Sequence, residues 1–125
     1  MIKIDFKKAG GLVPVITQDF KTNQVLMMAY MNKEAWQLTL KSRTVHYWSR
    51  SRQELWKKGG SSGNIQMVKE IRVDCDSDCV LIKIQQKGKA ACHTGYQSCF
   101  YRAVKNNELV VDGKKIFDPK KVYGG

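Results

Sequence analysis

All four cysteines, three aspartates and one of the two histidines lie between residues 74 and 102, in the stretch DCDSDCVLIKIQQKGKAACHTGYQSCFYR. Cysteine thiolates suit a borderline metal such as zinc, whereas aspartate oxygens suit a hard cation such as magnesium. One short segment therefore offers both kinds of ligand. The sequence predicts a metal site, and it favours two kinds of metal.

Asp74, Asp76 and Asp78 occupy alternate positions. On an extended strand they would share one face, with about 6–7 Å between successive residues. Carboxylates so arranged repel one another unless a cation lies among them, and a hard divalent ion such as Mg²⁺ is the favoured interpretation. The alternative is a solvated acidic turn, because D-x-D-S-D also has the composition of a turn. The glycine and glutamate positions of an EF-hand loop are absent.

Cys75 has the opposite parity to the aspartates, so on an extended strand its thiol would point to the other face. Cys75, Cys92 and Cys99 with a water or substrate would form an open zinc site of the catalytic type. With Cys79 as the fourth ligand, the site would be closed and structural. The residues alone leave both arrangements open.

His93 follows Cys92 directly and is a candidate acid or base, with a supporting hydrogen bond or a fourth zinc ligand as alternatives. His46 lies in the apolar run VHYW, which favours a packed or surface histidine. Zinc deaminases of nucleobases carry H-x-E and P-C-x-x-C motifs. Neither occurs here, since Trp48 and Gly95 stand two positions after the histidines.

The net charge of +11 permits nucleic-acid binding or a site for polyanionic small molecules. Most lysines are dispersed, which is typical of a solvated surface. One local concentration mixes basic residues with serine and glycine, as phosphate sites do. It contains Arg50, Ser51, Arg52, Lys57, Lys58, Ser61 and Ser62.

A length of 125 residues predicts a single domain spanning 1–125, with peripheral segments at 1–10 and 112–125. No apolar run approaches the length of a membrane span, and the N-terminus lacks the features of a signal peptide. We therefore expect a cytoplasmic protein, in which cysteines bind metals or act in catalysis more often than they form disulfides.

Periodicity predicts the elements that position these residues. Asn32 is the expected N-cap of a helix over 33–42. Residues 57–64, KKGGSSGN, are expected to form a loop. Strands are expected at 12–17, 24–30, 45–48, 65–73 and 79–86. The pattern predicts an α+β domain, mainly antiparallel β-sheet with one or two short helices.

The sequence also resembles the phosphoribosyl-AMP cyclohydrolase family of histidine biosynthesis. The resemblance covers most of the chain from residue 11 to residue 102 and is most specific in VDCDSD at 73–78 and ACHTGYQSCFYR at 91–102. Further matching segments are GLVPVITQD at 11–19, VLMMAYMN at 25–32, VHYWSRSRQELWKKG at 45–59 and SGNIQ at 62–66. Gly60 stands near a position where the family typically has an acidic residue.

The resemblance implies an enzyme that opens the adenine ring of N1-(5-phosphoribosyl)-AMP at the N1–C6 bond, by attack of a zinc-bound water on C6. It implies a homodimer in which Cys75, Cys92 and Cys99 bind a zinc ion shared between subunits. The aspartates, Asp74, Asp76 and Asp78, would bind magnesium, and His93 would move protons. The expected contacts to the two substrate phosphates are Arg50, Ser51, Arg52, Lys58, Ser61, Ser62 and Arg102.

A zinc-stabilised basic module that binds nucleic acid is the alternative function. It would use all four cysteines structurally, but the spacings are C-x₃-C and C-x₆-C instead of the paired C-x₂-C of common zinc ribbons. A redox protein is disfavoured because no C-x-x-C motif occurs. We therefore expect an enzyme with a small phosphorylated substrate and with neither nucleic acid nor a membrane as its partner.

Overall fold

The computed structural model describes residues 2–8, 10–60, 63–88, 90–92 and 94–117. These residues form one helix, α1 (Lys33–Ser42), and eight strands. The strands are β1 (Val13–Asp19), β2 (Val25–Met31), β3 (His46–Ser49), β4 (Glu54–Lys57), β5 (Gln66–Val73), β6 (Val80–Gln86), β7 (Arg102–Lys105) and β8 (Glu108–Val111).

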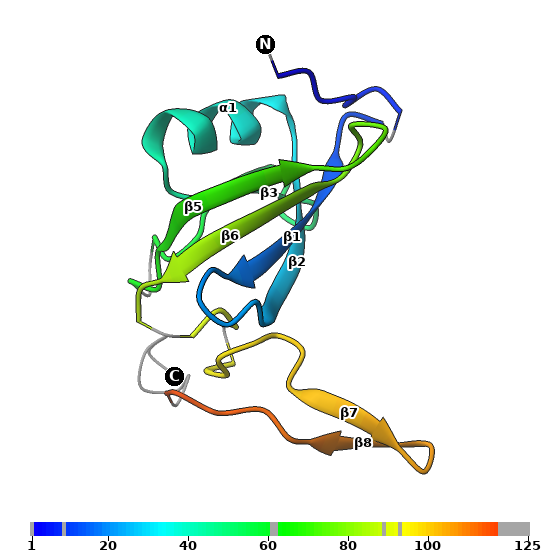
Figure 1. Ribbon diagram of the computed structural model, residues 1–125, viewed down its shortest axis with the longest axis vertical. Helices are drawn as coiled ribbons and strands as arrows, with labels where there is room; N and C mark the ends of the chain where they lie inside the picture. The colour runs from blue at the N-terminus through cyan, green and yellow to red at the C-terminus, as the bar shows by residue number, and fades with distance from the viewer. Residues whose placement is uncertain (1, 9, 61–62, 89, 93, 118–125) are drawn as a thin grey trace.

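A four-stranded sheet in the order β2-β1-β6-β5 forms the centre of the molecule (Figure 1). The β1–β2 and β5–β6 pairs are antiparallel, and β1 pairs with β6 in parallel. Alternate side chains of β1 and β6 face the core, where Val13, Val15, Val80, Ile82 and Ile84 are fully buried. Burial of these aliphatic side chains is the main stabilising term of such a sheet.

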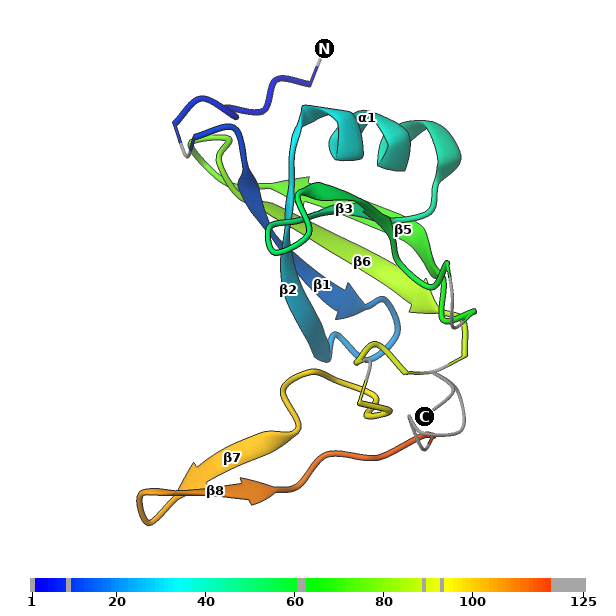
Figure 2. The same cartoon turned by 180° about the vertical axis from the view of Figure 1, so that it is seen from behind.

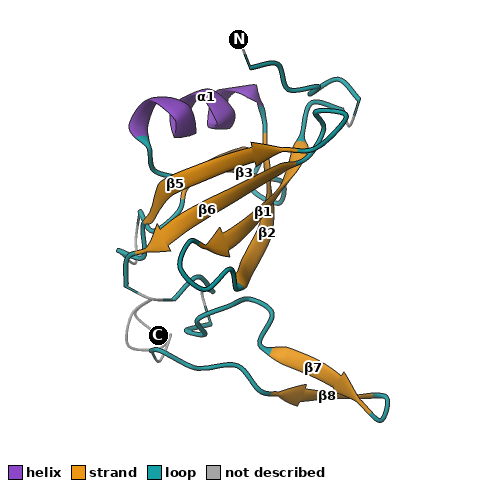
Figure 3. Cartoon of the chain, in the orientation of Figure 1, coloured by secondary structure: helices purple, strands orange, loops and turns teal. Residues whose placement is uncertain are grey.

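The helix α1 lies at the same end of the molecule as the N-terminus (Figure 3). The Oδ1 atom of Asn32 accepts a hydrogen bond from the backbone N–H of Ala35 at 2.8 Å, as expected of an N-cap. The helix ends at Arg43, whose φ of 62° is left-handed. Trp36 and Thr39 join Ala35 in the buried face. The helix predicted over 33–42 is confirmed at both ends.

The β7–β8 hairpin extends away from the sheet at the opposite end of the molecule (Figure 2). Asn106 and Asn107 form its two-residue turn, and both have positive φ angles, 51° and 63°. Two such residues give the turn a twist that matches the flanking strands. Sequence periodicity did not predict this hairpin, and it placed no strand at β4 either.

The α+β class with a mainly antiparallel sheet is confirmed, while the dimer stays a prediction.

Residues 114–117 lie against residues 95–97. The N–H of Gln97 donates to the carbonyl of Lys114 at 2.8 Å, and Tyr96 forms a β-bridge with Lys115. Across the described ranges, no helix has the length and apolar character needed to span a membrane.

A chain of side-chain hydrogen bonds runs through the core and ends at the loop that precedes β5. The Tyr47 hydroxyl donates to Oε1 of Gln66 at 2.6 Å, so the Thr17 hydroxyl, 2.7 Å away, must donate to the tyrosine oxygen. Gln66 Nε2 donates to Oε1 of Gln86 at 3.0 Å, and Gln86 Nε2 donates to the carbonyl of Asn64 at 2.6 Å. Strands β1, β3, β5 and β6 are thereby fixed to the loop that precedes β5.

We predict that Tyr47→Phe lowers the free energy of unfolding by about 1–3 kcal/mol, because it leaves polar groups of Thr17 and Gln66 buried without this partner. Urea denaturation followed by tryptophan fluorescence measures the loss. The Thr17→Val/Tyr47→Phe double variant should lose less than the sum of the two single variants. Strict additivity would show that the hydroxyl pair contributes nothing of its own.

Candidate functional site

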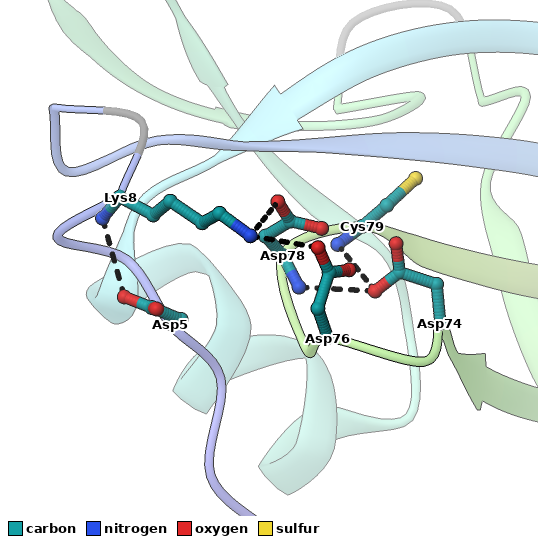
Figure 4. A network of polar contacts seen from close by, with 6 residues as sticks. All are labelled: Asp5, Lys8, Asp74, Asp76, Asp78 and Cys79. Carbon is teal, nitrogen blue, oxygen red and sulfur yellow. Dashed lines mark hydrogen bonds and ion pairs between the residues drawn. The ribbon is translucent and has the colours of Figure 1, made fainter.

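The three aspartates lie in the turn that joins β5 to β6 (Figure 4). Oδ1 of Asp74 accepts hydrogen bonds from the N–H groups of Asp78 at 3.0 Å and Cys79 at 3.1 Å. Ser77 has a left-handed φ of 61°. The extended strand is therefore the wrong interpretation of this segment, and the turn is the correct one. The turn brings one oxygen of each aspartate within 4.8 Å of the others, an arrangement that suits one hard cation.

A lysine far away in the sequence neutralises part of this charge. The Lys8 ammonium lies 2.7 Å from Oδ2 of Asp76 and 3.2 Å from Oδ2 of Asp78. Hydrogen bonds to these two carboxylates raise the pKa of Lys8. The bond from Lys8 lowers the pKa of Asp76 to about 2, whereas the hydrogen bond with Asp76 raises the pKa of Asp78. Sequence reasoning missed Lys8, since nothing local marks it.

Cys92 and Cys99 lie in the segment between β6 and β7. The buried Cys92 begins a turn in which its carbonyl accepts from the N–H of Gly95 at 3.0 Å, and its thiol lies 2.9 Å from the Thr94 hydroxyl. Gly95 has a φ of +93°, and a Cβ there would lie 1.9 Å from the carbonyl oxygen of Phe117. The N–H of Cys99 donates to the carbonyl of Leu26 at 2.7 Å, which ties this segment to β2.

The two thiols influence each other. The pKa of the Cys99 thiol is raised to about 12, first because the surrounding protein displaces water and then because of the charge and hydrogen bonding of Cys92. As a residue, Cys99 is nonetheless exposed. Without a metal, both effects favour the protonated thiol. A bound cation would favour the thiolate instead.

Lys58 lies close enough to the Cys92 and Cys99 thiols to interact with them electrostatically. The residue is only 7% exposed, and its ammonium lies 5.1 Å from the centroid of the Trp56 ring. Burial lowers the pKa of Lys58, and the charges of Cys99 and Cys92 partly oppose that change. A lysine predicted to contact phosphate therefore lies beside the thiol pair, where it can balance thiolate charge.

Cys75 lies apart from the other two predicted zinc ligands. It is exposed in the acidic turn before β6, whereas Cys92 and Cys99 follow the other end of that strand. Seven residues of β6 span about 20 Å, several times a zinc–sulfur bond. Figures 1 and 2 show these connections at opposite ends of the sheet. In the part of the chain that the structure describes, the aspartates are the only group of three metal-binding side chains found together.

Four of the predicted phosphate contacts lie in two separate places. Arg50, Ser51 and Arg52 occupy the turn between β3 and β4, where the Arg50 guanidinium lies 4.0 Å from the ring centroid of Tyr30. Arg102 begins β7, far along the chain, and no interaction found among the described residues joins it to that turn. The turn between β3 and β4 is therefore positively charged, and the Tyr30 ring helps to hold the Arg50 guanidinium in place.

Three predicted site residues, Ser61, Ser62 and His93, lie outside the described residues. The other histidine, His46, lies at the start of β3 with its Nδ1 atom 3.0 Å from the carbonyl oxygen of Thr44. It belongs to no group of metal-binding side chains among the described residues. This placement agrees with the expectation of a packed or surface histidine.

Comparison with known proteins identifies relatives over nearly the whole length. Residues 27–101 match the family model for phosphoribosyl-AMP cyclohydrolase. A phosphoribosyl-AMP cyclohydrolase from Desulfatibacillum aliphaticivorans is 59% identical over 123 residues, covering 98% of each chain. The chain belongs to the phosphoribosyl-AMP cyclohydrolase family. A second member, from Desulforapulum autotrophicum, is 60% identical over 124 residues, covering 98% of this chain and 99% of its own.

A third relative is similar over most of its length and most of this chain. A phosphoribosyl-AMP cyclohydrolase from Methanothrix thermoacetophila is 58% identical over 114 residues, covering 91% of each chain. The matched region 27–101 contains the acidic turn and the thiol pair, and it ends one residue before Arg102. Both groups of candidate metal ligands thus lie within the part of the chain that the family model matches.

The carboxylate of Asp74 accepts two backbone hydrogen bonds of the turn, a structural role that Asp76 and Asp78 do not share. We predict that Asp74→Ala lowers the free energy of unfolding by about 1 kcal/mol, measured by urea denaturation without divalent ions. Asp74→Asn keeps the Oδ1 acceptor and should match the wild type. An equal loss in both variants would show that charge, and not the acceptor, holds the turn.

Proposed function

We propose that this protein hydrolyses the N1–C6 bond of the adenine ring of N1-(5-phosphoribosyl)-AMP, a step of histidine biosynthesis, in the cytoplasm. The observation that carries the proposal is near full-length similarity to relatives that bear the name phosphoribosyl-AMP cyclohydrolase. Alkylation at N1 leaves positive charge on the ring and makes C6 electrophilic. The oxygen of water bonds to C6, the N1–C6 bond breaks, and the ring opens to a carboxamide and an amidine.

The chemistry of the thiol pair supports a zinc ion at this centre. Cys92 and Cys99 supply two adjacent sulfur ligands, and Lys58 lies near them to balance their charge. When bound, zinc would supply a Lewis acid that lowers the pKa of water to about 7, so that a nucleophile exists at neutral pH. A third ligand is required to complete an open site of the catalytic type.

Cys75 is our proposed third ligand, contributed by a second copy of the chain. The length of β6 separates Cys75 from the thiol pair within one chain, so a partner subunit is the source that remains. The exposed β7–β8 hairpin supports an association of this kind. Val104 is 73% exposed and Leu109 60% exposed, and a two-stranded hairpin without a covering surface is marginally stable in water. Apolar surface of this kind marks an interface.

The acidic turn is the proposed magnesium site. Its three carboxylates lie within 4.8 Å of one another, and oxygen ligands are those that Mg²⁺ prefers. The substrate carries two phosphate groups, for which the Arg50–Arg52 turn, Lys58, Ser61, Ser62 and Arg102 remain the proposed contacts. The guanidinium groups suit phosphate because they donate hydrogen bonds in a planar fork.

The first test of this function is an absorbance assay with phosphoribosyl-AMP, together with metal analysis. Cys75→Ser, Cys92→Ser and Cys99→Ser should each lose zinc and activity, because an open three-thiolate site cannot lose a ligand and keep its metal. Cys79→Ser is the matched control and should keep both. Loss of zinc from a folded Cys79→Ser protein would instead support a closed four-cysteine site and contradict the proposal.

A subunit-mixing experiment tests the shared site. Inactive Cys75→Ser and Cys92→Ser proteins, mixed under conditions that exchange subunits, should regain part of the wild-type activity. In the heterodimer, one of the two sites would receive all three cysteines. Mixing Cys92→Ser with Cys99→Ser is the control that should regain none, because both changes lie on the same side of the proposed interface. Equal recovery in both mixtures would contradict the assignment.

The proposed task of His93 is to move protons at the reacting centre. His93→Ala should lower kcat by roughly 10²–10⁴-fold, the usual contribution of a general acid or base. Zinc content should remain near wild type, because three thiolates and a water already complete a tetrahedral shell. Single-turnover kinetics beside metal analysis make the measurement. A His93→Ala protein stripped of zinc would identify the histidine as a ligand instead.

A further inference from the structure

The Lys8 side chain belongs to the N-terminal segment and reaches the acidic turn between β5 and β6. Its ammonium lies 2.7 Å from Oδ2 of Asp76 and 3.2 Å from Oδ2 of Asp78, between the two carboxylates (Figure 4). These oxygens belong to the group that we propose as the magnesium ligands. A positive charge from the chain itself therefore sits where a cation would bind.

The contact is built by the backbone as well as by the ion pairs. The N–H of Asp5 donates to the carbonyl of Ser77, in the middle of the acidic turn, at 2.7 Å. The side chain of Asp5 then accepts a hydrogen bond from the N–H of Lys8 at 3.2 Å. Ile4 and Phe6 alternate with these residues and pack against the core. The N-terminal segment is thus anchored so that Lys8 reaches the turn.

A divalent ion and this ammonium compete for the same ligands. An Mg²⁺ ion binds oxygen at about 2.0–2.1 Å in near-octahedral geometry, which requires the carboxylate oxygens that Lys8 now engages. A lysine ammonium beside a bound ion would also be repelled by its charge. The Lys8 side chain is 49% exposed, so it can swing into solvent without disturbing the core.

We propose that Lys8 is a tethered counter-ion, which holds the acidic turn together when no divalent ion is bound and leaves when one binds. This inference rests on the proposed magnesium site and adds to it a residue that weakens cation binding. Lys8 would then set the range of ion concentrations over which the turn fills. It would also link the N-terminal segment to the state of the site.

Calorimetric titration of Mg²⁺ and Mn²⁺ into the full-length, zinc-loaded protein tests the competition. Lys8→Gln should bind both ions roughly two- to tenfold more tightly, the range that two exposed ion pairs permit. Lys7→Gln is a matched control, because it removes the same charge one residue away and Lys7 forms no ion pair among the described residues. Its affinity should stay within about twofold of wild type. Asp76→Asn should weaken binding in either background.

Lysine acetylation followed by mass spectrometry measures the displacement directly. In the wild type, Mg²⁺ should raise the acetylation rate of Lys8 relative to Lys7. An unchanged ratio at saturating Mg²⁺, or equal ion affinity in Lys8→Gln and Lys7→Gln, would overturn the inference and leave the proposed enzyme intact. Failure of every variant to bind a divalent ion would overturn the inference and the magnesium site together, while zinc content and hydrolysis would still report on the function.

Discussion

The parallel pairing of β1 with β6 is the contact on which the rest of the structure depends. It runs from Val15 opposite Val80 to Asp19 opposite Ile84 and joins two antiparallel hairpins into one sheet. Each hairpin alone would be marginal in water, because a two-stranded ribbon buries only part of its apolar face. The pairing also fixes the direction of β6. One end of that strand therefore carries the acidic turn, and the other leads to the thiol pair.

Each end of β6 carries a group of side chains that can become negatively charged, and each group has a lysine nearby. At the acidic turn, an exposed lysine, Lys8, forms ion pairs with the carboxylates of Asp76 and Asp78. At the thiol pair, the buried Lys58 lies near Cys99, whose raised pKa favours the neutral, protonated thiol. Carboxylate oxygens thus gather at one end of β6 and the Cys92 and Cys99 thiols lie beyond the other end. This separation agrees with ligands for two metals of different chemistry.

Local signals in the sequence predicted most of the central sheet. The apolar run at 12–17 and the Asn32 cap depend only on neighbouring residues, and the structure has both. The alternation expected over 65–73 is only partly present, because Met67 and Val73 are exposed and the register shifts between Val68 and Glu70. The acidic segment was ambiguous because D-x-D-S-D fits a strand or a turn. Hydrogen bonds accepted by Asp74 decided for the turn. The β7–β8 hairpin was missed although Asn106–Asn107 is a turn signal, since its short strands lack a buried face.

The remaining features could not be predicted from spacing. Lys8 and Asp76 are 68 positions apart, and only the folded chain brings them together. The separation of Cys75 from Cys92 depends on the direction of β6, which follows from its pairing with β1 and not from its own residues. The residues that could do chemistry were therefore visible in the sequence, whereas their grouping into two sites required the fold.

The contact between Gly95 and the end of the described chain has a consequence for how the protein is made. The carbonyl of Gly95 accepts hydrogen bonds from the N–H groups of Ile116 and Phe117, at 2.6 and 3.2 Å. The turn that begins at Cys92 is thus supported by residues that follow all eight described strands in the chain. The central sheet can form while synthesis continues, since domains fold as their chain emerges. The turn beside the thiol pair therefore acquires this support only after the chain has been synthesised as far as Phe117.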